Sequence, residues 1–243
     1  MSSSSLTTLV SLLLPCLLSL LLLHLSTVLD PDPDAAAPRV KKAPPLPLRF
    51  RHDGTFKILQ VADMHFGNGA ATRCRDVGPD GGGALCSDLN TTRFLRRLIE
   101  AEKPDLIAFT GDNIFGTSAT DAAESLLKAI SPAMEFKVPW AAILGNHDQE
   151  STMTREELMT FMSLMDYSVS QVNPPGFLVH GFGNYHIGIH GPYGSELVNT
   201  SLLNLYFLDS GDREVVNGVK TYGWIKESQQ AWLRSISLEL QVH

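Results

Sequence analysis

Short apolar runs alternate with amphipathic stretches over the first half of the chain. The expected strands are residues 56–62, 105–110 and 138–144, and the expected helices are residues 91–102 and 122–136. Each strand is a compact, mainly apolar run, whereas the helices space their apolar residues by three or four positions. Pro132 is expected to break the second helix early. This alternation predicts an α/β fold with parallel strand pairing.

The second half of the chain is richer in strands. Thr154 and Glu157 form a capping-box pattern that predicts the start of another helix. The strand-like runs that follow are residues 177–180, 185–190 and 203–208, and residues 229–240 are the last expected helix. We expect the later strands to pair in a more antiparallel way.

The N-terminal segment differs in composition from the rest. Residues 9–29 are strongly leucine-rich, so we interpret residues 1–29 as a cleaved secretory signal, with an uncleaved membrane anchor as the alternative. Residues 30–48 are rich in Pro, Asp and Ala and are expected to be a linker. Residues 49–243 form the expected globular domain.

Export is also indicated by the cysteines and by two glycosylation motifs. Cys16 lies in the leader, which leaves Cys74 and Cys86 as a possible disulfide pair or as two free thiols. Asn90 and Asn199 both begin Asn-x-Ser/Thr motifs. Together these features predict a secreted or vacuolar protein.

Composition sets two further bounds. The chain has 243 residues, of which 44% are hydrophobic, enough for a sizeable core. The formal net charge of −7, without a dense Lys/Arg run, argues against a nucleic-acid partner.

Polar clusters follow each of the first three expected strands. They are Asp63-Met64-His65, Gly111-Asp112-Asn113 and Gly145-Asn146-His147-Asp148. Each cluster alone is commonly just a turn, but ligand sites in open α/β sheets lie at the carboxyl ends of strands, where all three can meet. Carboxylate, imidazole and amide donors suit Zn, Mn or Fe. Two such metal ions can activate a water and clamp a phosphoryl group.

The order of these motifs, D-x-H, G-D-x and G-N-H-D, resembles the opening half of the calcineurin-like metallophosphoesterase signature. The surroundings of the first and third motifs, and residues 205–210, are similar to the small plant purple acid phosphatases, including those called probably inactive. The resemblance covers residues 56–243. It implies a two-sheet β-sandwich flanked by helices, and hydrolysis of phosphate esters with two metal ions (Fe, Zn or Mn).

The resemblance also assigns roles by position. Asp63 and His65 would hold the first metal, Asp112 would bridge both, and Asn146 would bind the second. His147 would face the phosphate and protonate the leaving group. Asp148 would orient His147 and is counted with it as a catalytic candidate.

Two places differ from the purple enzymes. Their first motif is D-x-G, where this chain has His65, and the tyrosine that binds ferric iron is replaced by Phe115. The resemblance therefore implies a colourless site.

The family pattern continues with further histidines that this chain does not match. His186 and His190 are interpreted as surface or packing residues, and so is His180. We therefore expect a C-terminally truncated domain that lacks its last strands. This leaves two hypotheses, a metal-dependent phosphoesterase or a non-catalytic exported protein that binds metal or phosphate.

Overall fold

The computed structural model describes residues 40–241 except residues 76 and 79–85. The expected leader, Cys16 and residues 30–39 of the expected linker lie outside the described residues. From Lys41 onward the chain forms one compact unit. Lys41 Nζ donates to the carbonyls of Ser163 (2.7 Å) and Ser168 (2.9 Å), so the end of the segment assigned to the linker contacts the domain.

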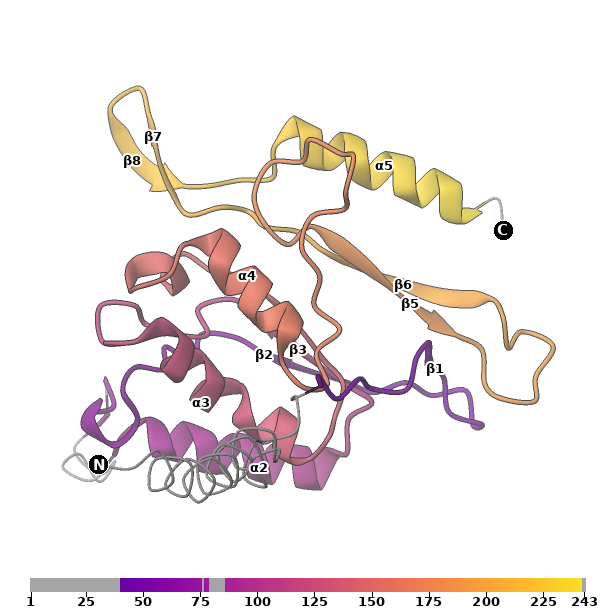
Figure 1. Cartoon of the computed structure of the whole chain (residues 1–243), viewed down its shortest axis with the longest axis horizontal. Coiled ribbons are helices and arrows are strands. Elements are labelled where there is room, and N and C mark those ends of the chain that lie inside the picture. Colours follow the sequence, from indigo (N-terminus) through magenta and orange to yellow (C-terminus); the bar gives the residue numbers. More distant parts are fainter. Residues whose placement is uncertain (1–39, 76, 79–85, 242–243) are drawn as a thin grey trace, which may run out of the picture. The chain divides into compact units, whose positions relative to one another are not determined.

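The first sheet is parallel, and the three motifs follow its strands along the chain. Two of its strands are labelled in Figure 1. Its strands are β2 (Ile58–Val61), β3 (Leu106–Thr110) and β4 (Trp140–Ile143), in the order β2-β3-β4. β3 is central, and its Leu106, Ile107 and Phe109 are fully buried. This explains why its sequence is continuously apolar rather than alternating. The three strands and the parallel pairing predicted from the sequence are confirmed.

Three long helices follow the strands of this sheet along the chain. They are α2 (Asp88–Glu102), α3 (Ala122–Glu135) and α4 (Arg155–Leu164). The capping box of α4 is present as predicted. The prediction that Pro132 ends α3 early is wrong. Pro132 cannot donate to the carbonyl of Lys128, but the Ser131 hydroxyl donates to that oxygen at 2.9 Å, so the helix continues to Glu135.

The second sheet combines a parallel and an antiparallel pair. It contains β1 (Leu48–Arg49), β5 (Tyr185–His190) and β6 (Ser201–Phe207), with β5 in the centre. β5 alternates strictly, with Tyr185, Ile187 and Ile189 buried. The Tyr185 hydroxyl donates to the carbonyl of Ala142 in β4 at 2.7 Å, which links the two sheets. The two-sheet α/β fold with flanking helices is therefore confirmed.

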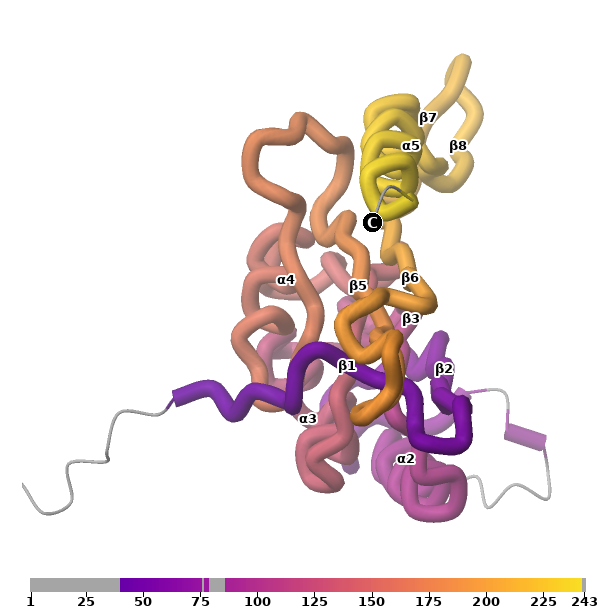
Figure 2. The backbone as a smooth tube through the Cα atoms, turned by 90° about the vertical axis from the view of Figure 1, so that its right-hand side faces the viewer, coloured from indigo at the N-terminus to yellow at the C-terminus, as the bar shows by residue number. Residues whose placement is uncertain are grey.

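The chain continues into a hairpin and a last helix. β7 (Arg213–Val216) pairs with β8 (Val219–Tyr222), and α5 (Glu227–Gln241) follows. Figure 2 shows the hairpin and α5 at the same end of the described residues, beyond β5 and β6. Two short 3₁₀ turns, η1 (Gly69–Ala71) and η2 (Asp148–Glu150), complete the described elements.

One expected strand is absent from the described residues. Residues 177–180 form a loop in which Leu178 is fully exposed. The amide of Asn173 donates to the carbonyls of Val179 (3.0 Å) and Gly181 (2.7 Å). A side chain therefore binds the carbonyls that a neighbouring strand would otherwise bind, and the prediction of a strand here is wrong.

No helix among the described residues combines the length and the apolar content needed to cross a bilayer.

Candidate metal centre

Backbone hydrogen bonds continue past the strand ends and bring the first two motifs together. Asp63 N–H donates to the carbonyl of Gly111 (3.1 Å), and His65 N–H donates to that of Asp112 (2.9 Å). Asp63, His65 and Asp112 all have positive φ, at 53°, 47° and 47°. Asp and His tolerate this left-handed conformation better than most residues. Backbone strain of this kind costs about 1–3 kcal/mol per residue, and strained residues often cluster at functional sites.

Two glycines allow the second and third motifs to approach each other. Gly111 has φ +109°, which only glycine adopts readily. Gly145 is different, because a Cβ there would overlap the carboxylate and the backbone nitrogen of Asp112. Its missing side chain is thus required for close approach rather than for a turn.

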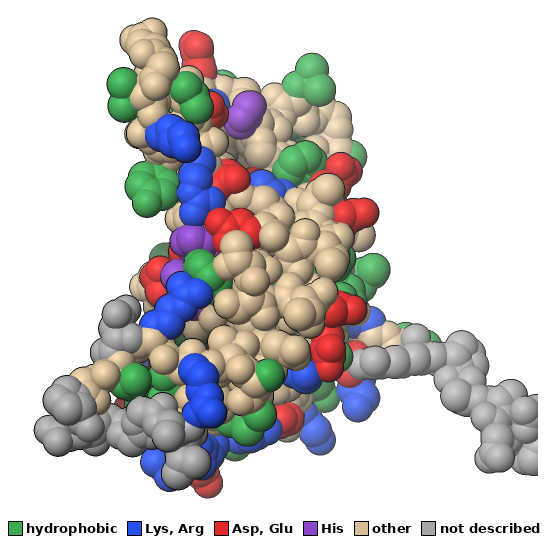
Figure 3. Space-filling model, turned by 90° about the vertical axis from the view of Figure 1, so that its left-hand side faces the viewer, with side chains coloured by type: hydrophobic (Ala, Val, Ile, Leu, Met, Phe, Trp, Pro, Cys, Tyr) green, Lys and Arg blue, Asp and Glu red, His purple; other side chains and the backbone are tan. Residues whose placement is uncertain are grey.

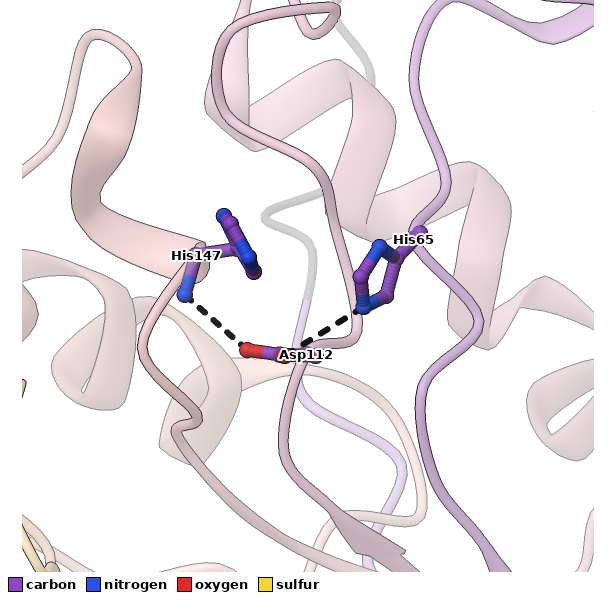
Figure 4. A group of neighbouring side chains, drawn as sticks. All are labelled: His65, Asp112 and His147. Atoms are coloured by element: carbon purple, nitrogen blue, oxygen red, sulfur yellow. Dashed lines mark hydrogen bonds and ion pairs between the residues drawn. The ribbon is translucent and has the colours of Figure 1, made fainter. Parts of the chain in front are cut away.

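His65, Asp112 and His147 converge at these strand ends (Figure 4). One potential ligand atom from each lies within 4.8 Å of the others. His65 Nε2 is 3.3 Å from Asp112 Oδ2 and 3.5 Å from Asp63 Oδ1. Asp112 Oδ1 accepts from the backbone N–H of His147 at 2.9 Å. One carboxylate with two imidazoles fits a borderline divalent metal such as Zn, Mn or Fe.

These three residues, the candidate metal group, differ from the ligand set expected from the sequence. His147 lies within it, although it was expected to face the phosphate. Asp63 lies at its edge, with a side chain that is 75% exposed. Asn146 precedes His147, and its backbone carbonyl accepts from the Gln149 side chain at 3.2 Å. A ligand role for Asp63 or Asn146 stays a prediction.

The His147 ring is held by Glu150 rather than by Asp148. Its Nδ1 lies 2.9 Å from Glu150 Oε2, and Arg213 binds the other carboxylate oxygen of Glu150 at 2.8 Å. Burial alone would raise the pKa of Glu150, but the hydrogen bonds from His147 and Arg213 outweigh it and lower that pKa. Glu150 was not among the expected site residues, although it lies only three residues after His147.

Asp148 joins two loops instead of orienting His147. Its side chain is fully buried, and its two oxygens accept from the backbone N–H groups of Ile114 (2.9 Å) and Gly145 (2.7 Å). Burial raises the pKa of Asp148 to about 6. The Asp148 carboxylate thus binds backbone donors rather than the His147 ring, and a catalytic role for Asp148 stays a prediction.

Phe115 is the residue that the resemblance places where the purple enzymes have an iron-binding tyrosine. Its ring stacks on His65 (centroids 5.5 Å apart) and lies 4.7 Å from the ring of His147. Because phenylalanine has no oxygen, this position adjoins the metal group without offering a ligand.

The two cysteines and the two glycosylation motifs are the remaining residues singled out in the sequence. Cys74 and Cys86 are joined by a disulfide bond, in agreement with the pairing considered from the sequence. Asn90 is in the first turn of α2, where its Oδ1 accepts from Ser87 N–H at 3.3 Å. Asn199 is exposed just before β6. Glycosylation of both stays a prediction.

The family of this chain follows from a comparison with protein families. The family described as calcineurin-like phosphoesterase matches residues 56–237, more than half of the chain. The chain belongs to the calcineurin-like phosphoesterase family. This confirms the resemblance inferred from the motifs, and the family implies phosphate-ester chemistry with divalent metal ions.

Curated relatives place the chain more narrowly. It is 64% identical over 210 residues to "Probable inactive purple acid phosphatase 28" of Arabidopsis thaliana, which covers 83% of this chain and 53% of that protein. It is 56% identical over 196 residues to "Probable inactive purple acid phosphatase 29" of the same plant. "Phosphatase DCR2" of Saccharomyces cerevisiae is 37% identical over 190 residues. The chain spans about half the length of the Arabidopsis relatives it matches.

Proposed function

We propose that the chain is a metal-dependent phosphoesterase that hydrolyses phosphate esters. The observation that carries this proposal is that consecutive parallel strands end at one place, where His65 and Asp112 offer ligand atoms and His147 lies beside them. Asp63 and His65 would hold one metal ion, Asp112 would bridge, and Asn146 would hold the second. Bound there, the two ions would supply an activated water and neutralise charge on the phosphoryl group.

The protein's own residues suggest how the leaving group departs. A protonated His147 that donates through Nδ1 to Glu150 has Nε2–H directed elsewhere, free to protonate the ester oxygen as the P–O bond breaks. Glu150 would stabilise the imidazolium and fix the ring orientation. In this proposal His147 acts as the general acid and not as a metal ligand.

Hydrolysis of 4-nitrophenyl phosphate tests the proposal. The chain is assayed from acid to neutral pH with added Mn, Zn or Fe, beside Asp112→Asn and the exposed Asp53→Asn as a matched control. We expect metal-dependent turnover that Asp112→Asn abolishes and Asp53→Asn retains. Absence of turnover from folded protein would reject catalysis by this chain.

A second candidate is a non-catalytic exported protein that binds metal or phosphate. The names of the Arabidopsis relatives, which include the word inactive, favour it. Metal binding by calorimetry without any turnover would support this reading.

We also propose export to the cell exterior or the vacuole. The leucine-rich leader and the Cys74–Cys86 disulfide support it, since disulfides persist in oxidising compartments. N-terminal sequencing of the exported product distinguishes a cleaved signal from an anchor, because an anchor retains residues 9–29.

A further inference from the structure

We propose that Arg75 forms a second anion-binding position beside the metal group, so that the preferred esters carry a second anionic group. This inference rests on the proposed function, and it narrows the substrate class. The second group would be a phosphate, sulfonate or carboxylate attached to the same small molecule.

Arg75 lies against the aromatic side chain that borders the metal group. Its guanidinium carbon is 3.8 Å from the centroid of the Phe115 ring. The same ring contacts His65 and His147. A ligand that reaches these histidines is therefore only one side chain away from the arginine.

The charge of Arg75 is available for a ligand. Within the described parts of the chain, neither Arg75 nor Arg73 forms an ion pair, whereas Arg213, which lies near His147, is bound to Glu150. A guanidinium that stacks on a ring keeps its in-plane N–H donors free. Those donors match the oxygens of a phosphate or sulfonate in pairs.

The two residues before Arg75 are held by a short antiparallel pairing of residues 73–74 with residues 86–87. Cys74 is covalently joined to Cys86, and its N–H donates to the Cys86 carbonyl at 3.2 Å. Arg73 forms an antiparallel bridge with Ser87, the residue before α2. Because the two residues before Arg75 are held in this way, binding an anion here loses less conformational entropy than binding at a free loop.

The space beside Arg75 exceeds what one phosphate needs. A cavity of about 590 Å³ is lined by Asp63, His65, Thr72, Arg73, Arg75 and Ser118, among others. On the face drawn in Figure 3, histidine side chains (purple) lie among blue Lys/Arg and red acidic side chains. The cavity thus joins one side of the metal group to two arginines that have no acidic partner among the described residues.

The test compares two stable ligands that differ by one anionic group. Ethylphosphonate and 2-sulfoethylphosphonate are titrated calorimetrically into the Mn-loaded chain, because the sulfonate is a poor metal ligand but a good partner for arginine. We expect the sulfonate compound to bind about tenfold more tightly, the value of one charged hydrogen-bonded contact. Arg75→Gln should remove this advantage, and Arg75→Lys should retain only part of it.

Arg97→Gln is the matched control, because Arg97 is an exposed arginine on α2. It should leave the advantage unchanged. Equal affinity of the native chain for the two ligands, no binding of either, or an advantage that survives Arg75→Gln would each overturn the inference. A chain that shows the advantage but no hydrolysis would refute the proposed catalysis and retain the second anion position.

Discussion

Arg155 and Asp209 form a buried ion pair that connects the third motif to the end of β6. The Asp209 side chain is fully buried, and the Arg155 side chain is 12% exposed. Arg155 Nη2 donates to Asp209 Oδ1, and Arg155 also donates to the carbonyl of Gly145 at 2.6 Å. Asp209 accepts further bonds from the N–H groups of Phe182 (2.7 Å) and Gly211 (2.8 Å).

Replacing Asp209 with Asn should be strongly destabilising. The variant loses the negative charge that compensates Arg155, and its amide NH₂ would face a donor where an acceptor is required. Removing one partner of a buried pair costs about 3–5 kcal/mol, a large part of the roughly 5–15 kcal/mol that stabilises a typical domain. Urea unfolding followed by circular dichroism measures this loss as a shift of the midpoint at constant slope.

The surface pair of Arg96 and Glu135 provides the control. Its two contacts are 2.7 and 2.8 Å long, but both side chains are 44% exposed. Glu135→Gln should therefore cost less than about 1 kcal/mol. If Asp209→Asn costs no more than Glu135→Gln, burial does not control the strength of this pair and the reasoning is refuted.

Three further predictions concern the metal centre. Gly145→Ala should weaken Mn binding at least tenfold in calorimetry, because its Cβ overlaps the Asp112 carboxylate; unchanged affinity would contradict the close approach. Asp148→Asn should cost about 1–3 kcal/mol in urea unfolding, since its NH₂ faces a backbone donor; an unchanged midpoint would reject this. The lowered pKa of Glu150 means that its stabilisation is complete above its ordinary value of 4.5 and is lost as pH falls further. In Glu150→Gln, the free energy of unfolding should no longer contain this pH-dependent contribution. A pH profile of unfolding identical to that of the native chain would contradict the prediction.

The central elements were predictable because their signals are local. β3 and β4 are buried on both faces, so their continuous apolar runs identified them, and the parallel order followed from the intervening helices. The hairpin of β7 and β8 was missed although Asn217-Gly218 is a strong turn signal, with φ of 51° and 79°.

The sequence predicted where the site lies, but not which side chains contact one another within it. The motifs identified the strand ends that meet, whereas the partner of His147 depends on how η2 turns. That turn places Glu150 against the ring and directs Asp148 into the interior. The position of Arg75 over Phe115 depends on a disulfide pairing that the sequence left open.

The left-handed backbone at position 65 has an evolutionary consequence. The resemblance implies glycine at this place of the first motif in the purple enzymes, where this chain carries histidine at φ 47°. Glycine adopts this conformation freely and histidine is among the side chains that tolerate it, whereas β-branched residues are excluded. A lineage can therefore exchange the two residues without rebuilding the loop. That exchange would add or remove one imidazole nitrogen beside Asp112 while the loop keeps its path.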